Sequence, residues 1–131
     1  AMDEKRANIL EMLLKPEIPN VMRQLPEKQI KVKRLSELLG AEFTMTLRGL
    51  PYGKVEELRE SGSQDMGVHI LLAGVVEPNL KDQRLKEKFG GATPAETVKA
   101  MFLPGEIEDI SRAIERLCGY RMTTIEEIKN V

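Results

Sequence analysis

Few residues in this sequence could carry catalytic chemistry or bind a metal. His69 is the only histidine and Cys118 is the only cysteine. A catalytic nucleophile needs a nearby base, and a metal needs several ligands at close spacing, but these two residues share no motif. Cys118 falls on the apolar face of an expected helix, where a free cysteine packs as a small hydrophobic residue. The sequence therefore predicts no catalytic residue, no metal site and no cofactor.

Two groups of charged residues have a functional and a structural interpretation. Glu106 and Asp109 could share a helix face as paired carboxylates, but acids in the first turn of a helix are explained by its dipole. The basic run from Lys28 to Arg34 could follow phosphates, but lysines on an edge strand also prevent association between sheets. The 20 basic and 21 acidic residues nearly cancel. We therefore expect no nucleic-acid partner.

The length and composition are those of one globular domain. The chain has 131 residues, of which 41% are hydrophobic and 31% charged, so we expect a single domain over residues 1–131 with one core. The longest apolar run, Ile70 to Val76, is too short to cross a bilayer. No signal peptide stands at the N-terminus. These features predict a cytoplasmic protein with no membrane partner.

The N-terminal segment of residues 1–28 predicts a helix followed by an extended connector. Asp3 to Lys15 has helical periodicity, and Pro16 and Pro19 stop the helix. Its narrow apolar stripe consists of Ile9, Leu10, Leu13 and Leu14. Such a stripe packs on its own domain or docks on a neighbouring subunit or partner. Both alternatives stay open at this point.

Residues 29–48 predict a small antiparallel β-hairpin. Apolar and polar residues alternate from Ile30 to Val32 and again from Phe43 to Leu47, which is the pattern of two half-buried strands. The segment from Ser36 to Ala41 contains Gly40, and we expect it to be a long hairpin loop.

Residues 51–131 predict a series of short helices with well-marked ends. Pro51 should open the first, and Val68 to Val76 should form a helix that is apolar almost all round and therefore central. Asp82 is the expected N-cap of the next helix, which Gly90 or Gly91 should close.

The clearest helix start lies at Thr93, Pro94 and Glu96, which have the spacing of a capping box. A long amphipathic helix should follow Pro104 and end at Gly119. Thr124 to Asn130 predicts a final short helix. The predicted fold is therefore mainly α (α+β), a compact bundle of about five to six short helices with a small hairpin near the N-terminal third.

Three stretches of this sequence point to a known family when they are taken together. They are FTMTLRGL at 43–50, GVVEPNLKD at 74–82 and TPAETVKAMFLPGEIEDISRAIERLCGY at 93–120. Their order and spacing resemble the XkdN-like family of phage and prophage tail assembly chaperones. The resemblance covers most of the chain.

This resemblance implies a non-enzymatic, mainly helical protein that acts in the host cytoplasm while a phage tail is built. It would bind the tape measure protein, keep that hydrophobic helical chain soluble and help to recruit tail tube subunits. Genes of such chaperones often express a second, frameshifted product. The alternative is a structural phage protein, such as a head-tail connector subunit, that stays in the particle.

We expect partners to contact two exposed turns and the apolar stripe of the first helix. The candidate partner-binding residues are Ile9, Leu10, Leu13, Leu14, Glu77, Pro78, Asn79, Lys81, Asp82, Pro104, Gly105 and Glu106. The turns are also explained as helix ends, and the stripe as packing within the domain. A stripe of this kind on a terminal helix would also suit a homo-oligomer.

Overall fold

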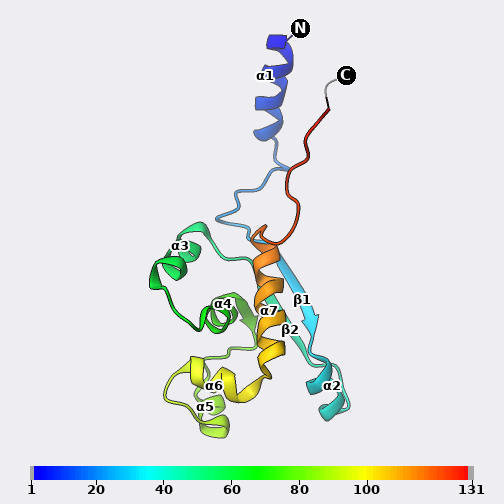
Figure 1. Ribbon diagram of the computed structural model, residues 1–131. Coiled ribbons are helices and arrows are strands. Elements are labelled where there is room, and N and C mark those ends of the chain that lie inside the picture. Colours follow the sequence, from blue (N-terminus) through cyan, green and yellow to red (C-terminus); the bar gives the residue numbers. More distant parts are fainter. Residues whose placement is uncertain (1, 130–131) are drawn as a thin grey trace.

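The computed structural model of the protein describes the backbone of residues 2–129 and the side chains of residues 8–129 (Figure 1). These residues form a mainly helical α+β fold with seven helices and three strands. In chain order the elements are α1 (Met2–Leu13), β1 (Glu27–Lys31), α2 (Lys33–Leu39), β2 (Thr44–Arg48), α3 (Tyr52–Ser61), α4 (Met66–Gly74), β3 (Val75–Glu77), α5 (Gln83–Phe89), α6 (Pro94–Met101) and α7 (Pro104–Leu117).

The strands form one antiparallel sheet in the order β1-β2-β3. The predicted hairpin is confirmed, with Ile30 opposite Met45 in its register. Its connection is not the expected loop, because the short helix α2 occupies most of it and ends at Gly40 in the left-handed conformation. The prediction for Val75 and Val76 was also wrong, because they form β3 and pair with β2 instead of extending α4.

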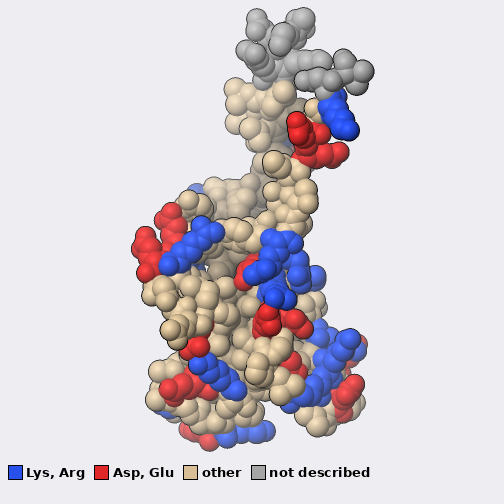
Figure 2. Space-filling model, in the orientation of Figure 1, with Lys and Arg blue, Asp and Glu red and all other residues tan. Residues whose placement is uncertain are grey.

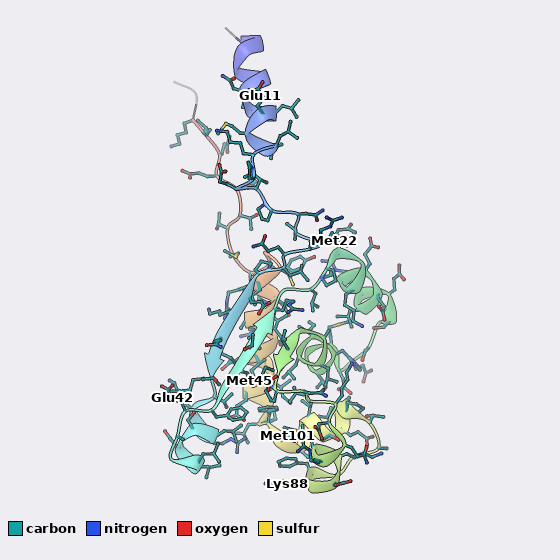
Figure 3. All side chains as sticks on the ribbon, turned by 180° about the vertical axis from the view of Figure 1, so that it is seen from behind. Glu11, Met22, Glu42, Met45, Lys88 and Met101 are labelled. Atoms are coloured by element: carbon teal, nitrogen blue, oxygen red, sulfur yellow. The ribbon has the colours of Figure 1, made fainter. Side chains whose placement is uncertain are left out.

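The core lies between the sheet and two helices. α7 packs on β2 and against α4, and α4 also contacts α6 and α3, so its predicted central position is confirmed (Figure 1). β2 alternates exposed and buried residues, which directs Met45 and Leu47 inward. Seen from behind, Met45 lies inside the body (Figure 3). The fully buried large side chains are those of Met45, Leu47, Leu71, Val98 and Ile114.

The helix starts follow the predicted capping chemistry. The Asp82 carboxylate accepts a hydrogen bond of 2.9 Å from the amide of Arg84 at the start of α5. The Thr93 hydroxyl accepts one of 3.3 Å from the amide of Glu96, as expected for an N-cap. The Glu96 carboxylate accepts from the amide of Ala92 at 2.6 Å, one residue before the amide that a standard capping box would use. Each cap satisfies a backbone donor that the helix itself leaves free.

The end of α7 is a Schellman motif, as the glycine at this position predicts. Gly119 has a φ of 92°, and its amide donates to the carbonyl of Arg116 at 3.0 Å. The amide of Tyr120 donates to the carbonyl of Glu115 at 2.9 Å. These two bonds satisfy carbonyls of the last turn and stop the helix.

Both terminal segments project from the same end of the body (Figure 1). Residues 123–129 have no regular secondary structure, so the helix predicted from Thr124 onward is not present there, and Asn130 lies outside the described residues. Ile125 and Ile128 are 84% and 85% exposed. A helix this short is unstable in water unless it packs against something. These isoleucines have no such contact in the structure.

Candidate partner-binding surfaces

The apolar stripe of α1 is exposed. It consists of Ile9, Leu10 and Leu13 on the helix and Leu14 directly after its end, and these four residues are between 60% and 76% exposed. α1 stands away from the rest of the molecule, and Glu11, on the same helix, lies far from the body (Figures 1 and 3). The structure therefore does not place this stripe in the core.

Further apolar side chains continue this exposed surface along both terminal segments. The connector from α1 to β1 contributes Ile18, Val21 and Met22, and the C-terminal segment contributes Met122, Ile125 and Ile128. None of these six residues was predicted as a partner-binding residue, because the connector has no helical or strand period and the C-terminal segment was expected to be a short helix. The available signal was a set of large apolar residues between prolines or in a polar segment, with no element to bury them.

The turn from Glu77 to Asp82 joins β3 to α5 and is only partly exposed. Leu80 is buried in the core, whereas Glu77, Asn79 and Lys81 are exposed. The side chain of Asn79 accepts a hydrogen bond of 3.0 Å from the amide of Lys81, which fixes the turn. The three exposed polar candidates of this turn therefore surround a buried anchor, Leu80.

Asp82 has a structural role in the same turn. Its carboxylate accepts hydrogen bonds from the guanidinium of Arg84, at 3.0 and 2.8 Å, and from the Arg84 amide. These bonds favour the ionised form and lower the pKa of Asp82 from its ordinary 3.8 to about 2. Asp82 is therefore a charged N-cap for α5 throughout the neutral range.

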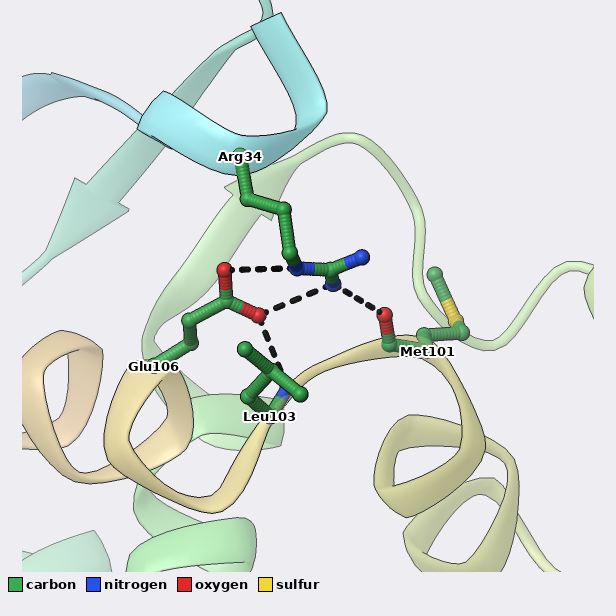
Figure 4. Close-up of polar contacts among 4 residues, drawn as sticks. All are labelled: Arg34, Met101, Leu103 and Glu106. Carbon is green, nitrogen blue, oxygen red and sulfur yellow. Dashed lines mark hydrogen bonds and ion pairs between the residues drawn. The ribbon is translucent and has the colours of Figure 1, made fainter. Parts of the chain in front are cut away.

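The turn between α6 and α7 is held by an ion pair (Figure 4). Arg34, from α2, donates to both oxygens of the Glu106 carboxylate, with Nε to Oε2 at 3.0 Å and Nη2 to Oε1 at 2.9 Å. The same Nη2 donates to the carbonyl of Met101 at 3.0 Å. Glu106 also accepts from the amide of Leu103 at 2.7 Å, which forms half of a capping box for α7.

The Arg34–Glu106 ion pair fixes the charge of Glu106. The side chain of Glu106 is 18% exposed, so its carboxylate is largely removed from water. The hydrogen bond from Arg34 lowers the pKa of Glu106, against a smaller opposing effect of burial. Of the candidate residues in this turn, Glu106 is thus engaged inside the protein, whereas Pro104 and Gly105 are exposed. The sequence did not predict this pair, because Arg34 was assigned to the basic run of the edge strand.

We expect Glu106→Gln to lower stability by about 1 kcal/mol at neutral pH, because it removes a charged hydrogen-bonding partner of Arg34. Because the folded-state pKa of Glu106 is depressed, its contribution is present above the unfolded-state pKa and is lost as the pH falls through the folded-state pKa. The difference between wild type and variant should therefore shrink in acid. Urea denaturation at a series of pH values measures it.

Glu108→Gln is the matched control for this prediction. Glu108 lies in the same helix and pairs with Arg112, but its side chain is 57% exposed. An exposed ion pair of this kind contributes little to the stability of the fold. The interpretation fails if Glu106→Gln costs no more than the control, or if its cost does not fall with pH.

An apolar hollow lies on the side of the body formed by α3, α4 and α7. It has a volume of about 380 Å³, and its walls include Val55, Leu58, Met66 and Ile70. At its rim, Arg59 lies over the ring of Tyr120 at 5.3 Å and donates to the Tyr120 hydroxyl at 2.9 Å. The hollow could hold an apolar side chain of a partner. The sequence gives no sign of this hollow, because its residues come from separate segments.

The residues considered for chemistry lie apart from one another. His69 is half-buried on α4, and Cys118 accepts a hydrogen bond from the amide of Leu50 at 3.1 Å. In the part of the chain that the structure describes, no cluster of three or more His, Cys, Asp or Glu side chains could hold a metal ion. None of the helices within residues 2–129 is long and apolar enough to span a membrane.

The sequence matches the model of a known protein family. Residues 10–131 match the family model described as "Phage XkdN-like tail assembly chaperone protein, TAC". The match places the chain in the class of phage tail assembly chaperones, which are non-enzymatic and act on tail proteins. The chain belongs to the XkdN-like family of this class, as its sequence motifs indicated.

A solved structure has a similar fold. It is described as the crystal structure of the protein yqbn, and it superposes with a TM-score of 0.62 at 17% sequence identity. The similarity covers 82% of this chain and 94% of the other. No curated protein matches this chain in sequence.

Proposed function

We propose that the protein acts in the bacterial cytoplasm as a chaperone that binds the tape measure protein and helps to recruit tail tube subunits. The observation that carries this proposal is the exposed apolar stripe of α1, on a helix that stands away from the body (Figure 1). Family membership supplies the class of partner, and the stripe supplies a surface on which an apolar partner segment can pack.

The energetics of the stripe favour contact with a partner. Each of its four aliphatic side chains is mostly exposed, and burial of such a side chain contributes on the order of 1–2 kcal/mol. α1 has 12 residues, a length at which an isolated helix is marginal in water. An amphipathic partner helix would cover the stripe and stabilise α1 at the same time. A tape measure protein, with its apolar helical segments, has this chemistry.

Neighbouring methionines suit the stripe for varied apolar sequences. Met12, Met22 and Met122 are exposed on α1, on the connector and on the C-terminal segment. A methionine side chain is flexible and polarisable, so it adapts to partner surfaces of different shape. A chaperone that moves along a long apolar chain needs this tolerance.

A second partner can bind at the other end of the molecule. The exposed residues Pro104 and Gly105 begin α7 at the end of the body opposite α1 (Figure 1). This separation lets one surface hold the tape measure protein while another contacts a tube subunit. The turn from Glu77 to Asp82 supplies further exposed polar groups for such a contact.

Co-expression with a fragment of the neighbouring tape measure gene tests the proposal. The wild-type protein should keep the fragment soluble and co-purify with it. Leu10→Gln with Leu13→Gln should abolish both effects, because the double substitution removes half of the stripe while keeping good helix formers. Leu38→Gln with Leu39→Gln is the matched control, since these α2 leucines are similarly exposed.

Two results would overturn parts of this proposal. If the wild-type protein neither solubilises nor retains the fragment, the chaperone function is wrong. If the control pair abolishes binding as strongly as the stripe pair, the stripe is not the binding surface. Mass spectrometry of finished particles completes the test, because a chaperone should be absent from them, whereas a structural subunit would be present.

A further inference from the structure

We propose that the free edge of β1 binds residues 123–129 of a second copy of this chain as an added strand. The inference rests on the unpaired backbone groups of β1, on a basic groove beside them and on the acidic sequence of the segment. It is independent of tape measure binding.

The register of the sheet shows which backbone groups of β1 are free. The amide of Val32 donates to the carbonyl of Phe43 at 3.1 Å, and the amide of Gly49 donates to the carbonyl of Pro26 at 2.8 Å. In an antiparallel pair, every second residue bonds to the partner strand and the residues between point the other way. Glu27, Gln29 and Lys31 therefore direct their N–H and C=O groups away from β2. Within residues 2–129, no other strand lies along this edge.

A groove beside this edge would receive alternate side chains of an added strand. It lies between β1 and α7 and has a volume of about 470 Å³. Its floor includes the half-buried Ile30 and the buried Val32, Ile110 and Ala113. An extra strand continues the sheet, so half of its side chains would project over this apolar floor. The groove thus offers side-chain contacts in addition to backbone hydrogen bonds.

The rim of the groove is basic. It is formed by Lys28, Lys31, Lys33, Arg34 and Arg116, together with Glu106 and Asp109. Because Arg34 and Glu106 neutralise one another, four basic groups face one acid among these lining residues. Figure 2 shows lysine and arginine side chains, with acidic side chains among them, on the side of the molecule that carries β1 and α2. The groove therefore favours an acidic strand.

Residues 123–129 have the matching chemistry. Their sequence is Thr-Thr-Ile-Glu-Glu-Ile-Lys, which combines β-branched residues with two adjacent acids. In an extended conformation Thr123, Ile125, Glu127 and Lys129, the last residue of the segment, share one face. Ile125 would then cover the apolar floor while Glu127 meets the basic rim. In the structure the segment is exposed and projects away from the body (Figure 1).

The segment suits the edge of a second copy better than its own. It leaves the end of α7 and continues away from β1, so that its own edge could be reached only by a reversal and a parallel pairing (Figure 1). A second copy is free to pair in the antiparallel sense, which is slightly more stable per residue. Lysines on the edge oppose pairing of one β1 with another β1, and this leaves the acidic segment as the preferred strand.

Sedimentation velocity of the full chain at increasing concentration tests the inference. The wild type should dimerise, and Glu126→Lys with Glu127→Lys, or Lys28→Glu with Lys31→Glu, should each raise the dissociation constant about tenfold or more. All four substitutions in one chain should restore most of the affinity. Lys86→Glu with Lys88→Glu, on α5, is the control and should change nothing. Amide exchange at Gln29 and Lys31 should slow as the dimer forms.

Three results would overturn the inference. A chain that stays monomeric at the highest concentration excludes it, and slow exchange at Gln29 in that monomer would assign the edge to the chain's own segment. Association that none of the charge reversals changes would assign the contact to another surface, such as α1. The chain with all four substitutions must first be shown to be folded by circular dichroism. If it is folded and its affinity is not restored, direct pairing of the two charged segments is excluded.

Discussion

Replacing Gly74 with alanine should lower the free energy of unfolding by about 1–3 kcal/mol, the usual cost of overpacking a core. A Cβ atom on Gly74 would lie 2.6 Å from Cγ2 and 2.7 Å from Cδ1 of Ile114. Both residues are buried where α4 crosses α7. The Ile114 side chain therefore has little room to move, and the two helices must separate or distort. Urea denaturation of wild type and variant measures the loss.

Gly67→Ala is the control within the same helix. Its added Cβ would lie 3.6 Å from the Ser111 hydroxyl, an ordinary van der Waals distance. Alanine is up to about 1 kcal/mol more favourable than glycine in a helix, so this variant should be neutral or more stable. Equal effects at the two positions would show that helix propensity, and not the contact with Ile114, determines the result.

A double-mutant cycle isolates the contact further. Ile114→Ala alone should cost about 2–5 kcal/mol through the cavity that it creates. In the Gly74→Ala background it should cost less, because it also removes the atoms that the new methyl group meets. A coupling energy near zero would mean that these side chains do not interact as the structure shows.

Local signals predicted the helix ends, because the chemistry of a cap involves residues only a few positions apart. Asp82, Thr93 and Gly119 each take the capping position that their types and neighbours indicate. The hairpin was predictable for a similar reason, since alternation along Phe43 to Leu47 reports which face is buried. These features depend on residues that lie close together in the sequence.

Features that depend on distant residues were not predictable. β3 forms because Val75 pairs with β2. Nothing in the sequence of α4 indicates that the residues directly after this helix lie beside a strand. α2 begins at Lys33, its N-cap residue Val32 provides no side-chain cap, and its 7 residues are too few to show a clear period. The segment from Thr124 onward was expected to be helical, but in the structure it does not pack on the rest of the protein and forms no helix within the described residues.

The candidate partner-binding surfaces also differ in whether they depend on nearby or on distant residues. The apolar stripe of α1 was visible because its spacing is local, and the structure adds that it is exposed. The role of Glu106 was not visible, because Arg34 lies 72 residues away in sequence. A single sequence shows which residues are charged or apolar, but the fold determines whether their partners are inside the molecule or outside it.

Leu47→Ala should lower the free energy of unfolding by about 2–5 kcal/mol, as much as Ile114→Ala. Leu47 is fully buried in β2, the middle strand of the sheet, and belongs to the same core cluster as Leu71 and Ile114 of the helices. Removal of its side chain leaves a cavity between sheet and helices that well-packed neighbours cannot fill. Urea denaturation, monitored by circular dichroism, gives the change in the free energy of unfolding.

The same variant tests whether the hairpin and the helices form one cooperative domain, as expected from the length of the chain. If they do, Leu47→Ala should shift a single transition without changing its slope, and amide exchange should accelerate in α4 and α7 as well as in β1 and β2. Leu103→Ala, the same substitution at an exposed position, should stay within about 0.5 kcal/mol of wild type. Acceleration confined to the strands would instead make the hairpin a separate unit. The ion pair between Arg34 and Glu106 argues for one unit, because it ties the hairpin connection to the start of α7.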